Sequence, residues 1–515
     1  MTTAKTAKPT FGQRLGDVLS RPLTDYIGIL AVTGALTVIG MLMVLSSSMA
    51  MSVQENNSVW AIALRQFMMV FAGLVAMWIM MRIRPAHLRR LGVPMMAVAI
   101  ILLVLVLIPG LGTGLEQMGS QSWLVLGPLT LQPSEVAKFT LGVWGSAFLA
   151  KRLREARDVI SLFGTFIIVI ALVLVLVLLE RDLGMMASLA VVVVALSWFG
   201  GMPRWIVTLG SVVLALALVV FTATVGFRST RISVYLEGLR GNFLDTQGAA
   251  YQSYQGYLSL ADGGINGVGL GQSRAKWFYL PEAKNDFVFA IVGEELGFIG
   301  AMMVVLLFLM LGFFGMRIAM RSKDPFLRLL AATTTTGIVV QAFVNMGYVV
   351  GLLPVTGLQL PLISAGGTSV IITLASMGLL ASCARHEPEA ISAMQENGRP
   401  AFDRWLMLPE PTNALSTSAE RADKPKRASG QQRFGEPVTA RSSAQRRARG
   451  AMPPAAGRAG GRSTGGHSTG GHASSRSTGG AARRGTERSA YRGEQRYSPS
   501  PRRGEYNPSE RRRNR

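Results

Sequence analysis

Ten apolar segments follow one another between residues 25 and 385, and this succession constrains the fold more than any other feature. A helix that crosses a bilayer needs about 20 mostly apolar residues. The segments are Tyr26–Ser48, Trp60–Met81, Leu91–Ile108, Ser134–Ala150, Leu162–Leu179, Leu183–Phe199, Trp205–Val225, Phe287–Met316, Leu329–Leu353 and Thr368–Ala384. We therefore predict an all-α polytopic membrane protein with ten transmembrane helices.

Basic residues mark every second connection between these segments. They occupy the N-terminal segment 1–24 and the second, fourth, sixth and eighth connections, whereas the other short connections contain only Arg181. Short cytoplasmic loops are enriched in Lys and Arg. The pattern predicts a multi-pass protein of the plasma membrane with both termini in the cytoplasm. The basic residues are Lys5, Lys8, Arg14, Arg21, Arg82, Arg84, Arg89, Arg90, Lys151, Arg152, Arg154, Arg157, Arg204, Arg317, Arg321, Lys323 and Arg328.

Two long segments lie outside the predicted helices. Segment 226–286 joins the seventh and eighth helices on the outer side, and loops of this length are often functional. Segment 386–515 is basic and rich in Gly, Ser and Arg, so we expect a disordered cytoplasmic tail. An anionic leaflet or a cytoplasmic partner of unknown identity would attract it. Its aromatic content does not favour nucleic-acid binding. The single cysteine, Cys383, excludes an intrachain disulfide.

Ionisable residues at membrane depth are the candidate functional groups. Glu135 and Lys138 are three residues apart and share one helix face, which predicts an ion pair with or without a role in a site. Asp286 stands at the outer mouth of the eighth helix, which suits a general base. Glu294 and Glu295 lie deeper, and they serve either as helix contacts or as a proton relay. Gln341, Asn345 and Gln359 most simply bond neighbouring helices.

Cations gather in the outer loop. Arg228, Arg231, Arg274, Lys276 and Lys284 would attract a phosphorylated or pyrophosphorylated ligand, although plain loop solubility explains them too. The glycines of Gly267-x-Gly269-x-Gly271 lack a strand–helix unit, so we interpret them as turn residues. Composition and spacing leave open whether the protein transports a substrate or transforms it.

Several stretches resemble one family, the SEDS proteins of shape, elongation, division and sporulation. They are Trp123–Gly127 with Leu131–Lys138, Asp182–Gly184, Tyr279–Phe287 with Gly293–Gly297, and Gly351–Gly357 with Leu360–Thr368. The matches cover residues 25–385 in order. The long tail and the stretches Asp324–Leu330 and Ala384–Ala390 are similar to division members in their actinobacterial form, more than to elongation members.

This resemblance implies a SEDS-type bundle of ten helices, with a large outer loop, that polymerises lipid II into glycan strands at the outer face during septal cell-wall synthesis. The family's catalytic aspartate corresponds to Asp286. The candidate substrate-binding residues in the matched stretches are Trp123, Glu135, Lys138, Glu282 and Lys284. Arg228, Arg231 and Lys276 are further candidates, because the leaving pyrophosphate needs positive charge. The implied partners are lipid II, a class B penicillin-binding protein and other divisome proteins. The cations would bind the pyrophosphate with or without a divalent metal. The sequence contains no separate cluster of metal ligands, so any divalent cation, Mg²⁺ or Mn²⁺, would be held largely by the pyrophosphate.

The sequence departs from the family pattern at three places. Ser122 stands where the family commonly has Arg, Glu180-Arg181 where it has Gln-Pro, and Lys284 where it has His. Arg181 and Lys284 would compensate for the cation missing at Ser122. Two other functions remain open on the sequence alone. A lipid II transporter would use Glu294 and Glu295 as relay groups, and a divisome scaffold would need neither these nor Asp286.

Overall fold

The structure is a computed structural model, and it describes residues 10–56, 60–115, 119–127, 129–155, 159–224, 226–240, 250–274 and 285–411. The chain divides into two units, Met1–Arg427 and Ala428–Arg515. All described residues belong to the first unit.

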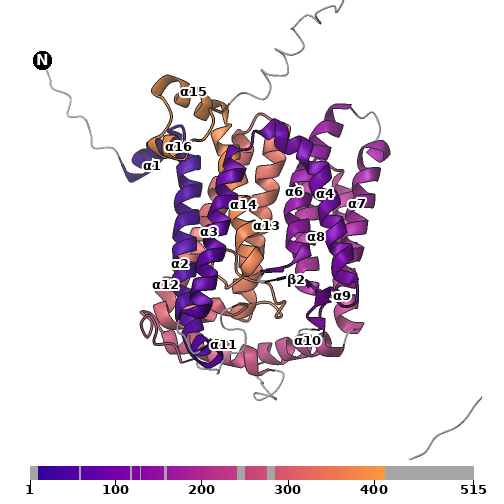
Figure 1. The fold of residues 1–515 in the computed structure, drawn as a ribbon, viewed down its shortest axis with the longest axis vertical. Coiled ribbons are helices and arrows are strands. Elements are labelled where there is room, and N and C mark those ends of the chain that lie inside the picture. The colour runs from indigo at the N-terminus through magenta and orange to yellow at the C-terminus, as the bar shows by residue number, and fades with distance from the viewer. Residues whose placement is uncertain are drawn as a thin grey trace, which may run out of the picture. The chain divides into compact units, whose positions relative to one another are not determined.

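A bundle of helices forms the body of this unit (Figure 1). Each of the ten predicted segments overlaps one helix, and the eighth helix is interrupted by a break at Gly297. The helices are α2 (Thr24–Asn56), α3 (Ala61–Arg82), α4 (Pro85–Leu107), α6 (Pro133–Glu155), α7 (Val159–Leu179), α8 (Leu183–Phe199), α9 (Arg204–Thr224), α12 (Val288–Arg321), α13 (Pro325–Val349) and α14 (Gly367–Arg385).

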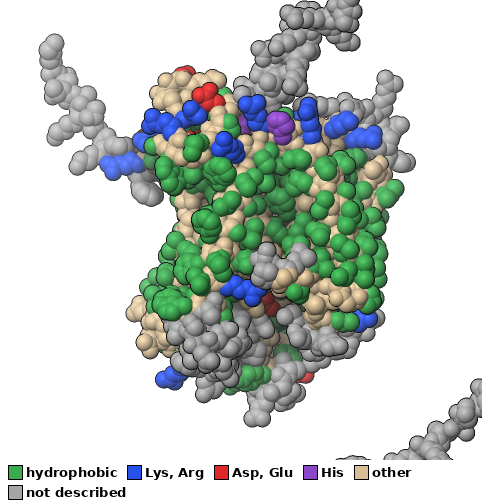
Figure 2. All heavy atoms as spheres, viewed as in Figure 1, with side chains coloured by type: hydrophobic (Ala, Val, Ile, Leu, Met, Phe, Trp, Pro, Cys, Tyr) green, Lys and Arg blue, Asp and Glu red, His purple; other side chains and the backbone are tan. Residues whose placement is uncertain are grey.

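Six of these helices are long and apolar enough to cross a membrane: α2, α3, α4, α12, α13 and α14. Shorter apolar helices occupy Phe163–Leu179, Leu183–Phe199 and Arg204–Val220. Apolar side chains on the outside of the bundle are widely exposed, for example Leu216 on α9 at 61% and Phe298 on α12 at 60%. Figure 2 shows one face of this apolar belt. Exposed apolar surface on this scale is typical of a protein surrounded by lipid.

The connections that the sequence assigns to the cytoplasm meet at one end of the bundle, which we call the basic end. Arg89, near the start of α4, forms an ion pair with Asp324, between α12 and α13. Arg317, near the end of α12, pairs with Asp25 at the start of α2 at 2.9 Å. Figure 2 shows Lys and Arg side chains gathered along this end. The amphipathic helix α1 (Phe11–Ser20) also lies here, where Arg317 donates to the backbone carbonyl of Leu19.

The opposite end, which we call the hairpin end, carries a small antiparallel sheet and two further helices. Strands β1 (Gly112–Thr113), β2 (Trp123–Leu126) and β3 (Leu129–Leu131) pair in the order β1-β2-β3, with Leu124 opposite both Gly112 and Leu131. Helices α10 (Gly226–Leu239) and α11 (Tyr251–Gly263) fall within the predicted outer loop and lie across this end in Figure 1.

The connection between α13 and α14 enters the bundle. We call residues 350–366 the re-entrant segment. Leu352 in its first part is exposed, whereas Leu360 and Ile363 are fully buried. Gly40 on α2 permits this approach, because an added Cβ would lie 2.1 Å from the carbonyl oxygen of Leu362. The ninth predicted segment extended to Leu353, but α13 ends at Val349, and Gly351 follows with a φ of +82°.

At the basic end the folded unit continues beyond residue 385, where the sequence placed the start of a disordered tail. Helices α15 (Pro388–Asn397) and α16 (Ala401–Trp405) pack on the bundle. The guanidinium of Arg385 donates to the Asp403 carboxylate at 2.8 Å, and the Tyr26 hydroxyl donates to the same carboxylate at 2.7 Å. The indole of Trp78 on α3 donates to the carbonyl of Leu406. Buried polar bonds that sequence periodicity does not reveal therefore hold residues 386–411 in place.

Candidate functional site

Asp286 lies in the short turn that precedes α12 at the hairpin end, and two buried side chains of α13 fix its backbone. The amide of Asn345 and the hydroxyl of Tyr348 donate to the Asp286 carbonyl oxygen at 2.9 and 3.0 Å. The hydroxyl of Ser364, in the re-entrant segment, donates to the carbonyl of Asn285 at 2.6 Å. The turn is therefore held from two elements, which limits the positions its carboxylate can take.

The Asp286 carboxylate and the Arg231 guanidinium flank Gly357 in the re-entrant segment. A Cβ at Gly357 would lie 3.5 Å from Oδ2 of Asp286 and 3.8 Å from Nη1 of Arg231. The Gly357 φ of +78° disfavours any other residue there. Arg231, on α10, also donates to the carbonyl of Val355 at 3.4 Å. Both charged side chains are partly exposed, so one ligand at this mouth can touch a carboxylate and a guanidinium together.

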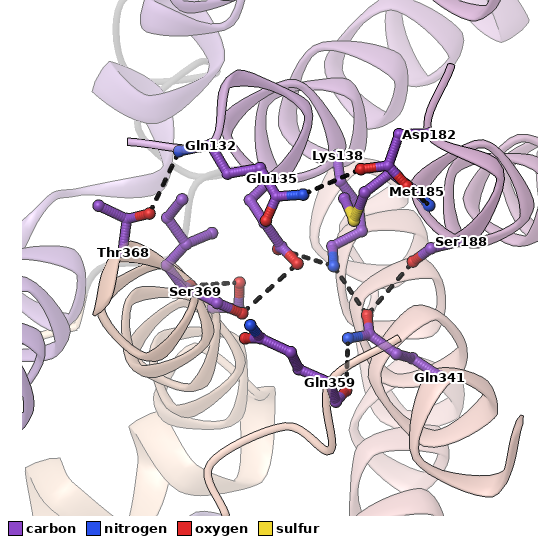
Figure 3. Close-up of polar contacts among 12 residues, drawn as sticks. Gln132, Glu135, Lys138, Asp182, Met185, Ser188, Gln341, Gln359, Thr368 and Ser369 are labelled. Carbon is purple, nitrogen blue, oxygen red and sulfur yellow. Dashed lines mark hydrogen bonds and ion pairs between the residues drawn. The ribbon is translucent and has the colours of Figure 1, made fainter. Parts of the chain in front are cut away.

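A second polar group lies deeper, around the predicted ion pair (Figure 3). The Lys138 ammonium is 2.7 Å from Oε2 of Glu135 and donates to Oε1 of Gln341 at 2.8 Å. Ser188 on α8 donates to the same amide oxygen, and the Gln341 amide nitrogen donates to the carbonyl of Gln359 at 3.0 Å. The predicted pair is thus present, and it ties α6 to α8, α13 and the re-entrant segment.

The hairpin end of α6 is tied to two further helices. The Gln132 side chain donates to the Asp182 carboxylate at 3.2 Å, and the same carboxylate caps α8 by accepting from the Met185 backbone. The Gln132 backbone donates to the Thr368 hydroxyl at the start of α14. Trp123, the first residue of β2, is partly buried opposite Thr113. Gln132, which directly follows the hairpin that carries Trp123, therefore holds the start of α6, the helix of Glu135.

Helix α13 connects the two polar groups. Gln341, which binds Lys138, and Asn345, which binds Asp286, are four residues apart and so lie on one helix face. A cavity of about 40 Å³ adjoins the deeper group between α6, α13 and α14. Glu135, Lys138, Gly142, Thr333, Gln341 and Ser376 are among its lining residues. The two polar groups therefore lie one helical turn apart along the same face of α13.

Removal of one partner of the deeper ion pair is expected to destabilise the fold. The Lys138→Met variant leaves Glu135, which is 3% exposed, without its counter-charge, and the expected loss is about 3 kcal/mol. We place the loss at the lower end of the range for buried pairs because the Lys138 side chain is 14% exposed. The double variant Lys138→Met/Glu135→Gln should recover most of it. Denaturant or thermal unfolding in detergent measures all three proteins, and a double variant as unstable as the single one would contradict this.

Several predicted site residues lie outside the described structure. Lys276, Glu282 and Lys284 fall in residues 275–284, and the Arg228 side chain on α10 is not described either. Among the described candidates, Asp286 and Arg231 both lie next to Gly357, and Glu135 pairs with Lys138. Trp123 lies on the β2–β3 hairpin, which directly precedes α6. Ser122 is 1% exposed, whereas Arg181, expected to supply the cation missing there, is exposed.

Just before a break in α12, the Glu294 side chain binds the outer loop and the Glu295 side chain binds α2. The Ser273 hydroxyl and the Arg274 backbone each donate to the Glu294 carboxylate at 2.7 Å. The Ser46 hydroxyl of α2 donates to Glu295 at 2.5 Å. The break follows at Gly297, whose φ is +68°. Gly267, Gly269 and Gly271 all have positive φ, as expected of turn residues, and the segment that contains them bonds to the backbone of α12 there.

Sequence reasoning underestimated three residues. Asn345 was expected only to bond a neighbouring helix, and Tyr348 and Ser364 were not singled out, yet all three fix the turn that carries Asp286. Their signal is weak, because each is a single polar residue in an apolar stretch. In the described part of the chain, no group of three His, Cys, Asp or Glu side chains is arranged to hold a metal ion.

Comparisons with known proteins identify the family of this chain. A family model described as "Cell cycle protein", which covers FtsW, RodA and SpoVE, matches residues 27–389. The chain is 42% identical over 420 residues to the "Probable peptidoglycan glycosyltransferase FtsW" of Mycobacterium tuberculosis, and the match covers 81% of this chain and 79% of the relative.

Two solved structures share the fold. One is a chain from work on the structural coordination of polymerization and crosslinking by a peptidoglycan synthase complex, with a TM-score of 0.56 and 25% identity over 70% of this chain and 98% of that chain. The other is the rod shape determining protein RodA of Thermus thermophilus, with a TM-score of 0.52 and 25% identity over 72% of this chain and 98% of that chain.

Proposed function

The chain belongs to the FtsW, RodA and SpoVE family of cell cycle proteins, and we infer that it is a peptidoglycan glycosyltransferase that polymerises lipid II. One observation supports the proposed position of the active site. The Asp286 carboxylate lies at the mouth of the bundle, on a backbone fixed by Asn345 and Tyr348, and beside the Arg231 guanidinium.

Polymerisation joins the 4-hydroxyl of an acceptor sugar to the anomeric carbon of a donor. The hydroxyl must lose its proton as it attacks, and we propose that Asp286 accepts this proton as a general base. The bond between the anomeric carbon and the pyrophosphate oxygen breaks, and undecaprenyl pyrophosphate leaves with its negative charge. Arg231 lies close enough to Asp286 to bind a phosphate of the same ligand.

The other proposed contacts surround this centre. Glu135 and Lys138 would bind polar parts of the substrate deeper in the bundle than Asp286. Trp123, on the β2–β3 hairpin, would cover the substrate from the hairpin end. Arg228, Lys276, Glu282 and Lys284 complete the proposed substrate-binding set. A divalent cation, Mg²⁺ or Mn²⁺, would bind together with the pyrophosphate.

The topology and the partners are part of the same proposal. All ten bundle helices would cross the plasma membrane, with the basic end and both termini in the cytoplasm and the hairpin end outside. A class B penicillin-binding protein would crosslink the glycan and activate the polymerase, together with other divisome proteins at the septum. The tail would contact the anionic leaflet or a cytoplasmic partner.

The transporter alternative gains little support from Glu294 and Glu295. Both carboxylates are 1% exposed, and each accepts a hydrogen bond that attaches another segment to α12. A relay group must exchange its proton with water or a substrate, which such anchoring contacts oppose. A scaffold would not need a partly exposed carboxylate on a backbone fixed by two buried side chains. The enzyme proposal accounts for Asp286, and the alternatives do not.

Replacement of Arg231 should weaken binding of lipid II. A charge-assisted hydrogen bond contributes about 1.5–3 kcal/mol, so kcat/KM for lipid II in Arg231→Ala is expected to fall about 10- to 100-fold, mainly through KM. Arg231→Lys should retain part of the activity, because the charge remains while the fork geometry is lost. Arg240, in the turn after the same helix, is exposed, and Arg240→Ala serves as the control. A KM unchanged in Arg231→Ala would remove this residue from the site.

The function is tested with purified protein, lipid II and the cognate penicillin-binding protein whose crosslinking is blocked. Glycan polymer from this mixture, and none when the chain is omitted, supports the glycosyltransferase. Vesicles that contain labelled lipid II test transport in the same preparation. Lipid II flipping without polymer would favour the transporter. If a folded preparation shows neither polymerisation nor flipping, the scaffold function is favoured.

A further inference from the structure

The turn between α7 and α8 clamps both ends of the β2–β3 hairpin. The Gln121 backbone, just before β2, donates to the Glu180 carbonyl oxygen at 2.9 Å. The Gln132 side chain, just after β3, donates to the Asp182 carboxylate at 3.2 Å. The hairpin carries Trp123 and leads directly into α6. The position of this turn therefore sets the position of both Trp123 and the Glu135–Lys138 pair.

The Glu180 side chain is buried in this clamp. Its exposed fraction is 0%, and neither carboxylate oxygen has a hydrogen-bond partner among the described residues. A buried ionised carboxylate without donors is costly, whereas a protonated carboxyl is neutral and can itself donate. Burial raises the pKa of Glu180 to about 9, and the nearby charge of Asp182 acts in the same direction.

The surroundings offer Glu180 no counter-charge among the described side chains. Arg181 is exposed at the protein surface, and the described residues 119–127 and 129–132 of the hairpin contain no ionisable group. The helices packed against α7 and α8 are α4, α6, α9 and α13. At the hairpin end their ionisable groups are the Glu135–Lys138 pair, which is mutually neutralised, and the Tyr348 hydroxyl.

We propose that Glu180 retains its proton in the folded protein and that this proton keeps the hairpin clamp closed. Glu180 is then a positioning residue, which acts on the site through the hairpin and not by contact with substrate. Loss of the proton would place a second negative charge beside Asp182 inside the buried clamp. The clamp would then open and admit water. The catalytic consequence rests on the proposed function, but the opening itself does not.

The sign of the pH effect follows from linkage. The folded-state pKa is raised from 4.5 to about 9, so the folded protein holds a proton that the unfolded chain releases. The stability associated with this proton is fully present below pH 4.5 and is lost as the pH rises through about 9. Glu180→Gln has nearly the same shape and is always neutral. It should therefore be more stable than the parent at neutral and alkaline pH, and its clamp should stay closed.

Labelling of a buried cysteine in the hairpin tests this directly. Ser122 is 1% exposed and lies next to Gln121, so Ser122→Cys reports opening of the clamp to a water-soluble maleimide. The native Cys383 is buried, and the parent chain without Ser122→Cys provides the blank. The labelling rate is compared between Ser122→Cys alone and Ser122→Cys/Glu180→Gln at each pH from 6 to 10, so that the pH dependence of the thiol itself cancels.

The labelling rate of Ser122→Cys divided by that of Ser122→Cys/Glu180→Gln should be smallest at pH 6. The ratio should rise by up to about tenfold per pH unit as the pH approaches the folded-state Glu180 pKa of about 9, and should level off above it. Asp17→Asn, which neutralises an exposed acid on α1, should behave like the parent. A ratio that stays near 1 throughout, or an equal effect of Asp17→Asn, would overturn the proposal. If labelling behaves as expected but the protein makes no glycan at any pH, the proposed function fails while the clamp proposal stands.

Discussion

Asp286→Asn is expected to fold normally and to polymerise lipid II about 10²- to 10⁴-fold more slowly than the parent, the range that a general base contributes. The amide has almost the same shape as the carboxylate but cannot accept the proton of the acceptor hydroxyl. The fold should persist because Asn345 and Tyr348 hold this turn through the backbone carbonyl of residue 286, which the substitution leaves in place. The initial rate of polymerisation and the melting temperature are measured on the same preparation.

Asp262→Asn provides the matched control, because Asp262 is an exposed acid on α11 at the same end of the bundle. Its polymerisation rate should equal that of the parent. A rate of Asp286→Asn within a factor of about three of the parent would exclude Asp286 as the base. A large fall in melting temperature would instead assign Asp286 a structural role.

Arg385→Met is expected to cause the largest loss of stability, about 3–5 kcal/mol, since it leaves Asp403 buried without its counter-charge. The side chains of Arg385 and Asp403 are 1% and 0% exposed, and they join α14 to α16. The Arg385 guanidinium also donates to the carbonyl of Pro409 at 2.9 Å. Loss of this residue should therefore release the segment 386–411 from the bundle. Thermal unfolding and limited proteolysis at the basic end measure the two effects.

The exposed neighbour Arg404→Met is the control and should change the melting temperature little. The double variant Arg385→Met/Asp403→Leu removes both buried charges and should recover much of the loss. A chain truncated after residue 411 should be as stable as the full chain, and one truncated after residue 386 should not. Equal stability of the two truncated chains would contradict the structural role of this segment.

The sequence predicted the positions of the bundle helices along the chain, because each apolar segment is an independent signal. The helix positions, the basic end and the Glu135–Lys138 pair all follow from local spacing and charge. The re-entrant segment and the residues 386–411 were not predicted, since buried bonds between distant residues hold them, such as Tyr26 with Asp403. Apolar periodicity carries no information on such bonds.

The site was predictable in part for the same reason. Asp286 stood out as a carboxylate at a wet helix mouth, and Arg231 as a loop cation. The residues that fix the Asp286 turn, Asn345 and Tyr348, belong to a helix that begins about 40 residues after it, and only the folded chain brings them together. The burial of Glu180 was equally hidden, because a lone acid in a turn is typical of an exposed position.

The central claim is that Asp286 removes the proton of the acceptor hydroxyl, and a structure of the Asp286→Asn variant with lipid II and the partner protein tests it most directly. We predict the acceptor 4-hydroxyl within hydrogen-bond reach of residue 286, about 2.6–3.2 Å between oxygen or nitrogen atoms, with the pyrophosphate on the side of Arg231. Head groups bound elsewhere, with the acceptor hydroxyl beyond the reach of residue 286 even through one water, would contradict it.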